Sequence, residues 1–238
     1  AADAAGNVVT GQTFTIDATA PSVPTNPIDL PDGSDTGSSA TDNTTSTTAP
    51  TLRVYLTGTN AAVGDTIELL LGGASLTTAV TKVLDSTDVG NAYVDLTVTD
   101  GDLDTDGNKV FTAQVTDVAG NVGTAGGSLT VALDTTAPVH ANVTAITTDS
   151  GATGDRITND NDAGTTFTVN GGEVGATITV ELADVDITGT KFDIVDHSDN
   201  TYTLTVKAGV TLADGVYTVK AADAAGNVVT GQTFTIDA

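Results

Sequence analysis

The chain of 238 residues begins and ends with the same eighteen residues, AADAAGNVVTGQTFTIDA, at positions 1–18 and 221–238. An identical copy of this length does not arise by chance, so the sequence is a window of a tandem array. Repeat arrays provide length, stiffness or valency, and one unit needs no chemistry of its own. The fold must therefore be a small domain that repeats along the chain.

A junction motif sets the expected boundaries. IDATAP at 16–21 is matched by LDTTAP at 133–138, and a third copy begins at Ile236. We predict the closing hairpin of a preceding repeat at 1–18, one repeat at 19–134 and a second at 135–238, each long enough for its own core. The linkers of Thr, Ala and Pro are too short to act as flexible tethers, so successive repeats should stack end to end.

The apolar residues alternate with polar ones in short runs bounded by Gly, Asp or Asn, for example in YTLTV at 202–206. This period of two, rich in β-branched residues, predicts half-buried antiparallel strands, and no segment has a convincing helical period. The predicted fold class is all-β: tandem immunoglobulin-like Greek-key sandwiches of about seven strands each. The expected strands are 23–29, 51–57, 65–71, 79–84, 92–99, 109–117 and 128–134 in the first repeat, and 139–147, 165–170, 177–183, 191–196, 201–207, 215–223 and 228–237 in the second.

A D-x-A-G-N motif separates the last two strands of each repeat, at 117–121 and 223–227, and occurs a third time at 3–7. Asp caps a tight turn and Gly supplies the positive φ that closes a hairpin, so each copy predicts a hairpin turn. DGVY at 214–217 predicts a corner in which the Tyr217 hydroxyl bonds back to the chain. Phe111 stands at the equivalent position of the first repeat and has no such hydroxyl.

The charge is strongly unbalanced, with 31 acidic against 7 basic residues and a net charge of −24. This composition excludes a nucleic-acid partner and disfavours an anionic membrane, because both need patches of Lys or Arg. No apolar run is long enough for direct membrane insertion, and the absence of Cys excludes disulfides and thiolate metal sites. Only three of the acids are Glu, and this preference for Asp favours turns or cages for hard cations.

Three groups of aspartates are candidate Ca²⁺ ligands. The first is DLDTDG at 102–107, in which carboxylates at alternate positions precede a Gly, as in the front half of many Ca²⁺ loops; Ala113 stands where an EF-hand has its Glu. The second precedes the second strand of each repeat, and the third lies at the junctions. Solvated acidic loops and Asx turns are the alternative reading of the first two groups, and turn capping that of the third. The candidates are Asp102, Asp104 and Asp106, with Asp100 beside them; Asp35 and Asp42, with Asp32, and Asp149 and Asp155, with Asp160 and Asp162; and Asp17, Asp117, Asp134, Asp223 and Asp237.

The junction group rests on the expected topology. In an immunoglobulin-like chain the final hairpin tip of one repeat faces the end of the repeat before it, which places Asp117 near Asp17 and Asp223 near Asp134. Such carboxylates repel one another without a cation, and a shared Ca²⁺ would clamp the repeats together.

Catalytic arrangements are missing from the sequence. It has two histidines, His140 and His197, both expected in exposed loops, and no Cys, nucleophile elbow, phosphate loop or zinc spacing. Its many paired carboxylates lie in Gly- and Thr-rich turns, with no aromatic platform for a sugar. We therefore expect no enzyme activity.

Together, the junction motif, the D-x-A-G-N hairpin and the DGVY corner resemble the bacterial immunoglobulin-like repeats of giant adhesins of the calcium-dependent, type I-secreted (RTX) group. The resemblance covers both repeats and the tail. It implies a Ca²⁺-rigidified extender that projects an adhesive tip from the surface of a Gram-negative cell for attachment or biofilm formation. The implied partners are Ca²⁺ and the neighbouring repeats.

Two further expectations concern parts of the chain that depart from the repeat. The longer loops at 30–48 and 100–108 of the first repeat are where a rival function, carbohydrate or ligand binding, would be found. A lone two-stranded hairpin is marginal in water, so residues 1–18 should pair either by completing another molecule or by packing on the first repeat. We expect strand exchange with another molecule in concentrated or crystalline samples.

Overall fold

A computed structural model describes residues 2–8 and 10–238 of the chain. The chain divides into two compact units. One contains Ala1–Ile28, Val54–Leu96 and Phe111–Leu129, and the other contains Asp29–Arg53, Thr97–Val110 and Thr130–Ala238. The strands β2, β5, β6 and β7 contribute residues to both units. The described residues are nearly all in strands, turns and loops, as the sequence predicts.

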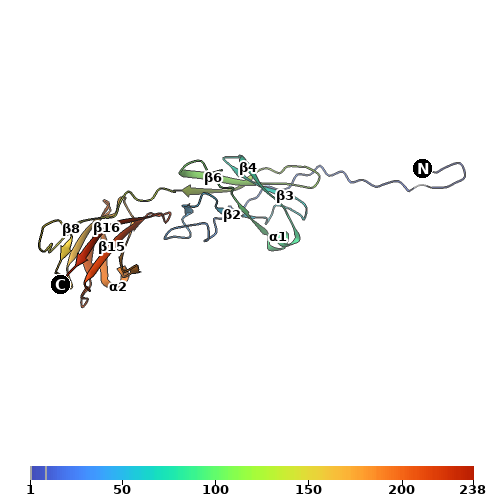
Figure 1. Ribbon diagram of the computed structural model, residues 1–238. Helices are drawn as coiled ribbons and strands as arrows, with labels where there is room; N and C mark the ends of the chain where they lie inside the picture. The colour runs from blue at the N-terminus through green and yellow to red at the C-terminus, as the bar shows by residue number, and fades with distance from the viewer. Residues whose placement is uncertain (1, 9) are drawn as a thin grey trace. The chain divides into compact units, whose positions relative to one another are not determined.

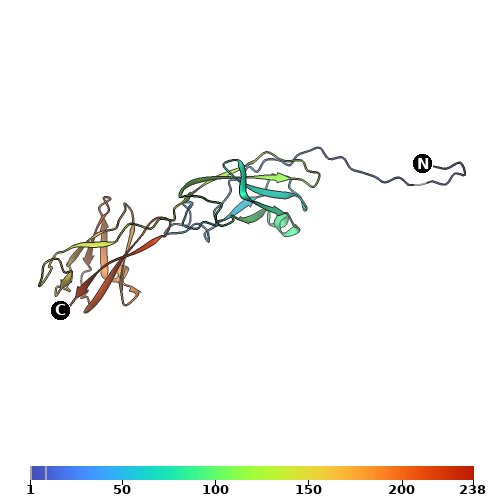
Figure 2. The same ribbon diagram turned by 45° about the horizontal axis from the view of Figure 1, so that its top comes forward.

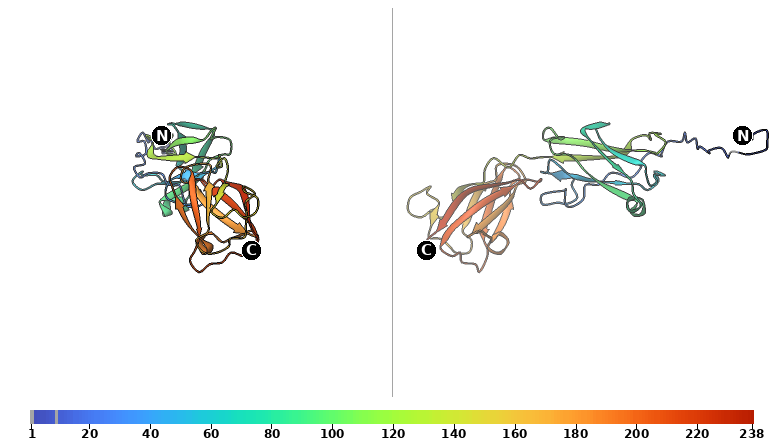
Figure 3. Two further views of the ribbon diagram at one scale, coloured as in Figure 1. Left: turned by 90° about the vertical axis from the view of Figure 1, so that its left-hand side faces the viewer. Right: turned by 45° about the vertical axis from the view of Figure 1, so that its right-hand side comes forward.

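The residues after Pro138 form a two-sheet sandwich, drawn in yellow to red in Figure 1 and with its two layers visible in Figure 3. One sheet has the order β13-β14-β10-β8 and the other β12-β11-β15-β16-β9, in which β9 pairs with β16 in parallel and the other pairs are antiparallel. The strands are β8 (Asn142–Ile146), β9 (Ile157–Thr158), β10 (Thr166–Asn170), β11 (Thr177–Leu182), β12 (Val185–Asp186), β13 (Phe192–Asp196), β14 (Thr201–Val206), β15 (Gly215–Ala222) and β16 (Val228–Ile236).

Aromatic side chains join the two sheets of this sandwich. Phe167 on β10 stacks on Phe234 of β16 with ring centroids 4.1 Å apart, and Tyr217 of β15 also stacks on Phe234, at 4.9 Å. Phe192 of β13 packs edge-on against Phe167 at 6.1 Å. All four side chains are at most 2 % exposed, so the alternating apolar positions do form the core.

The predicted corner is present. The Tyr217 hydroxyl donates to the carbonyl of Ala213 at 2.7 Å, four residues earlier in the chain. This bond satisfies the one polar atom of an otherwise buried ring and fixes the entry into β15.

The first repeat contains a five-stranded sheet of order β1-β7-β6-β3-β4 and a two-stranded sheet of β2 and β5. Here β1 pairs with β7 in parallel, as β9 does with β16 in the second repeat. The strands are β1 (Thr44–Thr45), β2 (Thr51–Tyr55), β3 (Thr66–Leu71), β4 (Ala74–Val83), β5 (Tyr93–Thr97), β6 (Gly107–Thr116) and β7 (Gly126–Leu133).

The predicted strand at 23–29 is wrong. This segment holds only a bridge between Asp29 and Arg53 and a bond from the Ile28 amide to the Gly127 carbonyl at 2.8 Å. Pro24 and Pro27 have no amide hydrogen to contribute to a ladder, which explains the loss. The sequence also did not predict the two-residue strands β1, β9 and β12, which are too short to show a period.

Two short helices were also missed, α1 (Ser86–Asn91), seen as a teal coil in Figure 2, and α2 (Thr188–Lys191). The first is closed by a capping box in which Asp85 accepts from the amides of Thr87 and Asp88, and Asp88 accepts from the Asp85 amide. Lys82 pairs with Asp88 at 2.6 Å. Helices of one turn are set by such local bonds and have no amphipathic pattern to detect. Neither helix is long or apolar enough to cross a membrane.

The segment before Pro21 belongs to no sheet and runs apart from the strands of its unit (Figures 1 and 2). A single bridge joins Ala2 to Val8, and Phe14 and Ile16 are 84 % and 81 % exposed. Their identical counterparts in β16, Phe234 and Ile236, are each 1 % exposed. Val9 lies outside the described residues. Strand exchange by this segment stays a prediction.

The duplicated segment provides a matched pair of variants. We expect Phe234→Ala to destabilise its repeat by roughly 3–5 kcal/mol, because the stacked ring leaves a cavity between the sheets. Phe14→Ala, in the same local sequence but exposed, should change stability by less than about 0.5 kcal/mol. Urea unfolding followed by circular dichroism measures both. Equal losses in the two variants would contradict the described burial.

Candidate functional site

The D-x-A-G-N turn has the same internal bonds in all three copies. In the second repeat, the Asp223 side chain accepts from the backbone amide of Asn227 through Oδ1 at 2.9 Å and from the Asn227 side-chain amide through Oδ2 at 2.8 Å. Gly226 has φ +89°, which allows the tight reversal. The turn at 117–121 has the corresponding bonds at 2.8 Å and 2.8 Å, and the turn at 3–7 at 2.9 Å and 2.7 Å.

The Asn side chain of this turn also reaches the end of the preceding repeat. Asn121 Nδ2 donates to the carbonyl oxygen of Asp17 at 3.1 Å. Asn227 Nδ2 donates to the carbonyl oxygen of Asp134 at 2.9 Å. The structure thus brings Asp117 to Asp17 and Asp223 to Asp134, in the same way at both junctions. Sequence reasoning selected the Asp of each turn but not the Asn that makes the contact.

At the first junction, three carboxylates surround a cleft of about 310 Å³. Asp17 and Asp117 come from the predicted group, and the third is Asp65, which is 5 % exposed and precedes β3. Several of their oxygens already accept local bonds: Asp17 Oδ1 from the Thr19 amide at 3.0 Å and Asp65 Oδ2 from the Ala62 amide at 2.8 Å. The hydrogen bond from the Asn121 side chain is the main cause that lowers the pKa of Asp117.

At the second junction the third carboxylate is Glu173, in the loop before β11. Partial burial raises the pKa of Glu173, and the negative charges of Asp223 and Asp134 raise it further. Both aspartates therefore repel the Glu173 carboxylate in the folded chain. Asp134 Oδ1 accepts from the Thr136 amide at 3.0 Å, and Asp223 is 3 % exposed.

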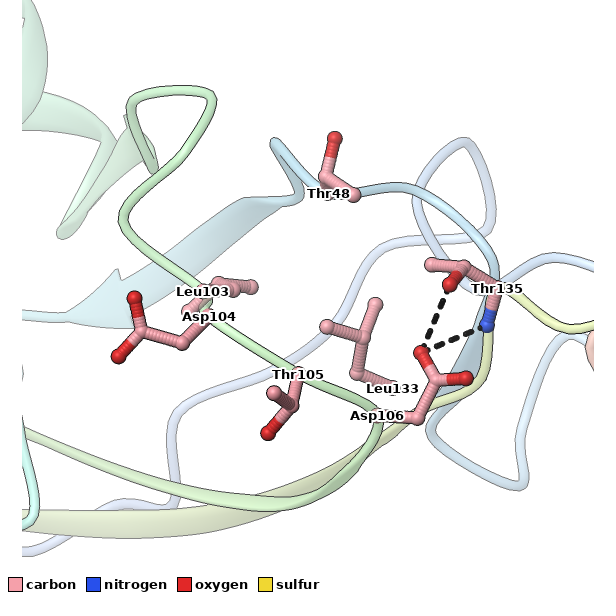
Figure 4. A pocket seen from close by; sticks show the side chains of 7 residues that line it. All are labelled: Thr48, Leu103, Asp104, Thr105, Asp106, Leu133 and Thr135. Carbon is pink, nitrogen blue, oxygen red and sulfur yellow. Dashed lines mark hydrogen bonds between the residues drawn. The ribbon is translucent and has the colours of Figure 1, made fainter.

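The loop at 100–108 does not gather its aspartates around one point. Leu103 is 4 % exposed and helps to line a pocket of about 250 Å³. Figure 4 shows Asp104 and Asp106 of this pocket pointing in different directions. Asp106 turns to the linker, where it accepts from the amide and hydroxyl of Thr135 at 2.9 and 2.8 Å and from the Thr136 hydroxyl at 2.7 Å.

These bonds give Asp106 the role of a linker cap. The hydrogen bonds from the Thr136 and Thr135 side chains, and then from the Thr135 amide, lower its pKa. Asp100 accepts from the Thr48 hydroxyl at 2.6 Å, which joins the loop to the other long loop of the repeat. Asp102 is half-buried and Asp104 is exposed.

In the other long loop of the first repeat, Asp35 is buried and Asp42 is exposed. Both accept from the amide of Thr44, Asp35 Oδ1 at 3.2 Å and Asp42 Oδ1 at 3.0 Å, so the structure places the two carboxylates together. Burial raises the pKa of Asp35, and the charge of Asp42 adds to the rise. Asp32 is exposed.

The equivalent aspartates of the second repeat are spread along their loop. Asp149 Oδ2 accepts from the Gly154 amide, and its Oδ1 is buried without a partner. Asp155 Oδ1 accepts from the Ile157 amide at 2.9 Å, and Asp160 Oδ1 from the Thr165 hydroxyl at 2.7 Å. Asp162 is exposed in the loop between β9 and β10, and Asp237 is exposed directly after β16.

Within residues 2–8 and 10–238, no three acidic or histidine side chains are grouped closely enough to hold a metal ion. The donor type, carboxylate and amide oxygen, is the one that Ca²⁺ takes, but a closed set of ligands is not formed. Asp65 and Glu173 are the acidic residues at the junctions that sequence reasoning missed. Neither belongs to a motif, since each reaches the junction only through the fold.

Each of the two histidines has a polar partner. His197 is exposed and bonds to the Thr203 hydroxyl at 2.9 Å, while His140 is half-buried and bonds to Asn170 Oδ1 at 3.0 Å. His197 lies in an exposed turn, as expected, and His140 is more covered than expected.

Residues 22–135 and 136–238 each match the family model of the bacterial Ig-like domain. The chain therefore belongs to this family and contains two tandem copies of its domain. It is a family of Ig-like adhesin and structural domains, not of enzymes. A search of curated proteins finds no significant match to the chain.

Several solved structures are similar to the chain. A Ca²⁺-stabilized adhesin that helps an Antarctic bacterium reach out and bind ice is 21 % identical (TM-score 0.41), covering 99 % of this chain and 54 % of its own. A 1.5-MDa bacterial ice-binding adhesin is 23 % identical (TM-score 0.42), with coverages of 99 % and 70 %. An I-band fragment of titin is 17 % identical (TM-score 0.36), with coverages of 82 % and 60 %.

This chain spans about half the length of the first of these structures, at 54 %. All three TM-scores lie below 0.5, so the family assignment rests on the family model.

The repulsion at Glu173 gives a testable result. In a calcium-free buffer with chelator, we expect Glu173→Gln to raise the free energy of unfolding by a few tenths to about 1 kcal/mol, because it removes a charge that Asp134 and Asp223 repel. Asp184→Asn is the matched control: it removes one charge from an exposed turn and should have little effect. Thermal unfolding at pH 7 measures both, and a loss of stability in Glu173→Gln would contradict the repulsion.

The pH dependence follows from the same shift. The folded pKa of Glu173 lies above its usual value of 4.5, so the folded state holds this proton more tightly than the unfolded state. Below its usual pKa, Glu173 is protonated in both states and the repulsion does not affect the free energy of unfolding. As the pH rises from this usual pKa through the raised pKa of the folded state, the repulsion lowers the free energy of unfolding. Glu173→Gln should remove this part of the pH dependence.

Proposed function

We propose that the chain is an extender segment of a bacterial cell-surface adhesin, located outside the cell, and that its role is to provide length between the cell and an adhesive tip. Membership of the bacterial Ig-like family in two tandem copies supports this role. A Gram-negative surface and a role in biofilm formation are part of the same proposal.

One observation carries the proposal: the repeated bond from the turn asparagine to the backbone carbonyl of the Asp that ends the preceding repeat. Asn121 with Asp17 and Asn227 with Asp134 use the same donor atom and the same kind of acceptor. A chain that repeats its junction contact as well as its domains is built to continue in one direction. An isolated binding module has no need for such a contact.

Calcium enters the proposal as a stiffening ion at the junctions. The support is electrostatic: each junction collects carboxylates from two repeats, Asp17, Asp65 and Asp117 at one and Asp134, Glu173 and Asp223 at the other. The chain carries a net charge of −24, so these groups gain from any divalent cation that neutralises them. Closing a full ligand set requires the side chains to shift from their present positions, or water ligands to complete it.

Small-angle scattering tests the extender with and without the ion. With Ca²⁺ in solution, we expect a single extended form with a larger maximum dimension than in chelator, where charge repulsion leaves the junctions hinged. If free Ca²⁺ is a hundred times its Kd, the ion should also add about 2.7 kcal/mol of stability. Sodium chloride at the same ionic strength is the control for screening.

A variant keeps this test specific to the junction. Glu173→Gln should reduce the Ca²⁺-induced rise in melting temperature, whereas Asp184→Asn should leave it unchanged. An unchanged maximum dimension in Ca²⁺ and in chelator would end the calcium part of the proposal.

A second candidate, binding of a small ligand, is favoured by the pocket of about 250 Å³ between the two long loops of the first repeat. It is lined by Thr48, Leu103, Asp104, Thr105, Asp106, Leu133 and Thr135 (Figure 4). The lining has no aromatic side chain on which a sugar ring could stack.

A glycan array probed with the full chain decides between the two functions. We expect no binding. Binding that is lost in Asp104→Ala, and kept in the exposed-turn variant Asp184→Asn, would favour the second candidate and place the ligand in this pocket.

A further inference from the structure

The tip of the hairpin between β15 and β16 is seated against the loop Asp29–Arg53, which belongs to the same compact unit. The Thr36 hydroxyl donates to the carbonyl oxygen of Ala225 at 2.5 Å. Ala225 is 0 % exposed, whereas its identical counterpart in the tail, Ala5, is exposed. The loop therefore covers the tip, and the tip sequence alone does not account for the burial.

We call Thr36, Gly37 and the carbonyl of Asp134 the seat of this tip. Close backbone contacts at Gly37 leave no room for a side chain between the seat and the tip. A Cβ atom added at Gly37 would lie 1.9 Å from the carbonyl oxygen of Ala224, and one added at Gly226 would lie 2.9 Å from Gly37 Cα. Neither position tolerates a side chain without moving the tip. Together with the bond from Asn227 to the Asp134 carbonyl at 2.9 Å, the seat holds the tip at two separate points through direct contacts between protein atoms.

The second repeat contains the same framework at its own far end. Asn43 in the first repeat and Arg156 in the second both have a positive φ, +58° and +63°. The Asn43 carbonyl accepts from the amide of Ala132 in β7 at 2.9 Å, and the Arg156 carbonyl accepts from the amide of Thr235 in β16 at 2.8 Å. The hydroxyl of Thr36 accepts from the Ser46 amide at 2.8 Å.

The matching bond in the second repeat runs from the Asn159 amide to the Ser150 hydroxyl at 2.9 Å. The backbone amide of Asp237 donates to the backbone carbonyl of Thr158 at 3.0 Å. In the first repeat the amide of Asp134 donates to the carbonyl of Thr45 at 2.9 Å in the same way. Ser150 and Gly151 thus stand where Thr36 and Gly37 stand in the first repeat.

We propose that Ser150, Gly151 and the carbonyl of Asp237 form a second seat, whose partner is the D-x-A-G-N hairpin tip of another repeat of this type. The Ser150 hydroxyl corresponds to the Thr36 hydroxyl, which donates to the carbonyl of Ala225 in the first seat. Gly151 is exposed and has φ +79°, and no atom lies within 4 Å of the place where its Cβ would stand. A hairpin tip can therefore approach Gly151 without meeting another part of the chain. The inference extends the proposed function by naming a metal-independent contact that orders the array.

Two glycines test the occupied seat with matched backbone strain. Gly37 and Gly151 have φ +93° and +79°, so changing either to Ala has a similar intrinsic cost, roughly 1 kcal/mol. The chain has no Cys, so spin labels can be attached at Cys introduced for the exposed residues Thr81 and Val195. In chelator, Gly37→Ala should broaden the distance distribution between the labels roughly two-fold or more, and Gly151→Ala should leave it unchanged.

The open seat is tested by adding its partner. A second copy of residues 136–238 placed after Ala238 reproduces the Asp-Ala-Thr-Ala-Pro junction of 17–21. With labels at Val195 and at its counterpart in the added copy, Gly151→Ala should now broaden the distribution in chelator as Gly37→Ala does in the original chain. No effect of Gly151→Ala in the lengthened chain would overturn the proposal.

Asparagine variants supply a second measurement if a glycine variant folds poorly. Asn227→Ala removes the bond to Asp134 together with one bond inside its turn, whereas Asn7→Ala removes only the turn bond. Only Asn227→Ala should broaden the distribution of the original chain. If the distance distributions narrow with Ca²⁺ but do not change in the glycine and asparagine variants, the calcium part of the proposed function is supported and the seat is contradicted. If they change in the variants but not with Ca²⁺, the seat is supported and the calcium part is contradicted.

Discussion

The rest of the structure depends on a short-range bond between two side chains, from the Asn amide of the D-x-A-G-N turn to the carboxylate of its Asp. Together with the bond from the Asn backbone amide, it closes the turn within five residues and aims the second hydrogen of the side-chain amide outward. That hydrogen meets the carbonyl of Asp17 at one junction and of Asp134 at the other. The turn is therefore both the end of a hairpin and a contact surface.

This arrangement answers a difficulty that the composition creates. A chain with a net charge of −24 repels itself, and the junctions bring carboxylates of two repeats together. The junctions place neutral contacts, an amide on a carbonyl and a glycine on a backbone, beside those carboxylates. In the proposed extender these neutral contacts limit the hinging at a junction. A bound cation would then change how stiff the junction is.

Much of the fold followed from the period-two pattern, because burial on one face of a strand requires it. Each of the seven strands expected in the second repeat overlaps a strand of the structure, and the Tyr217 corner is present. The strand predicted at 23–29 does not form, because its prolines have no amide hydrogen to donate to a neighbouring strand. For the candidate site, the sequence identified the turn aspartates, but the convergence of Glu173 with Asp134 and Asp223 joins loops far apart in the chain and has no local pattern.

The two copies of the eighteen-residue segment separate local from tertiary causes. In both, the sequence by itself determines the D-x-A-G-N turn, since its bonds join residues at most four positions apart and its Gly accepts a positive φ. Only the tertiary structure decides that Val228–Ile236 is a strand and that Phe234 is buried, while Phe14 is exposed and in no strand. A strand needs partners for its amides and a second sheet for its apolar face, and these come from distant parts of the chain.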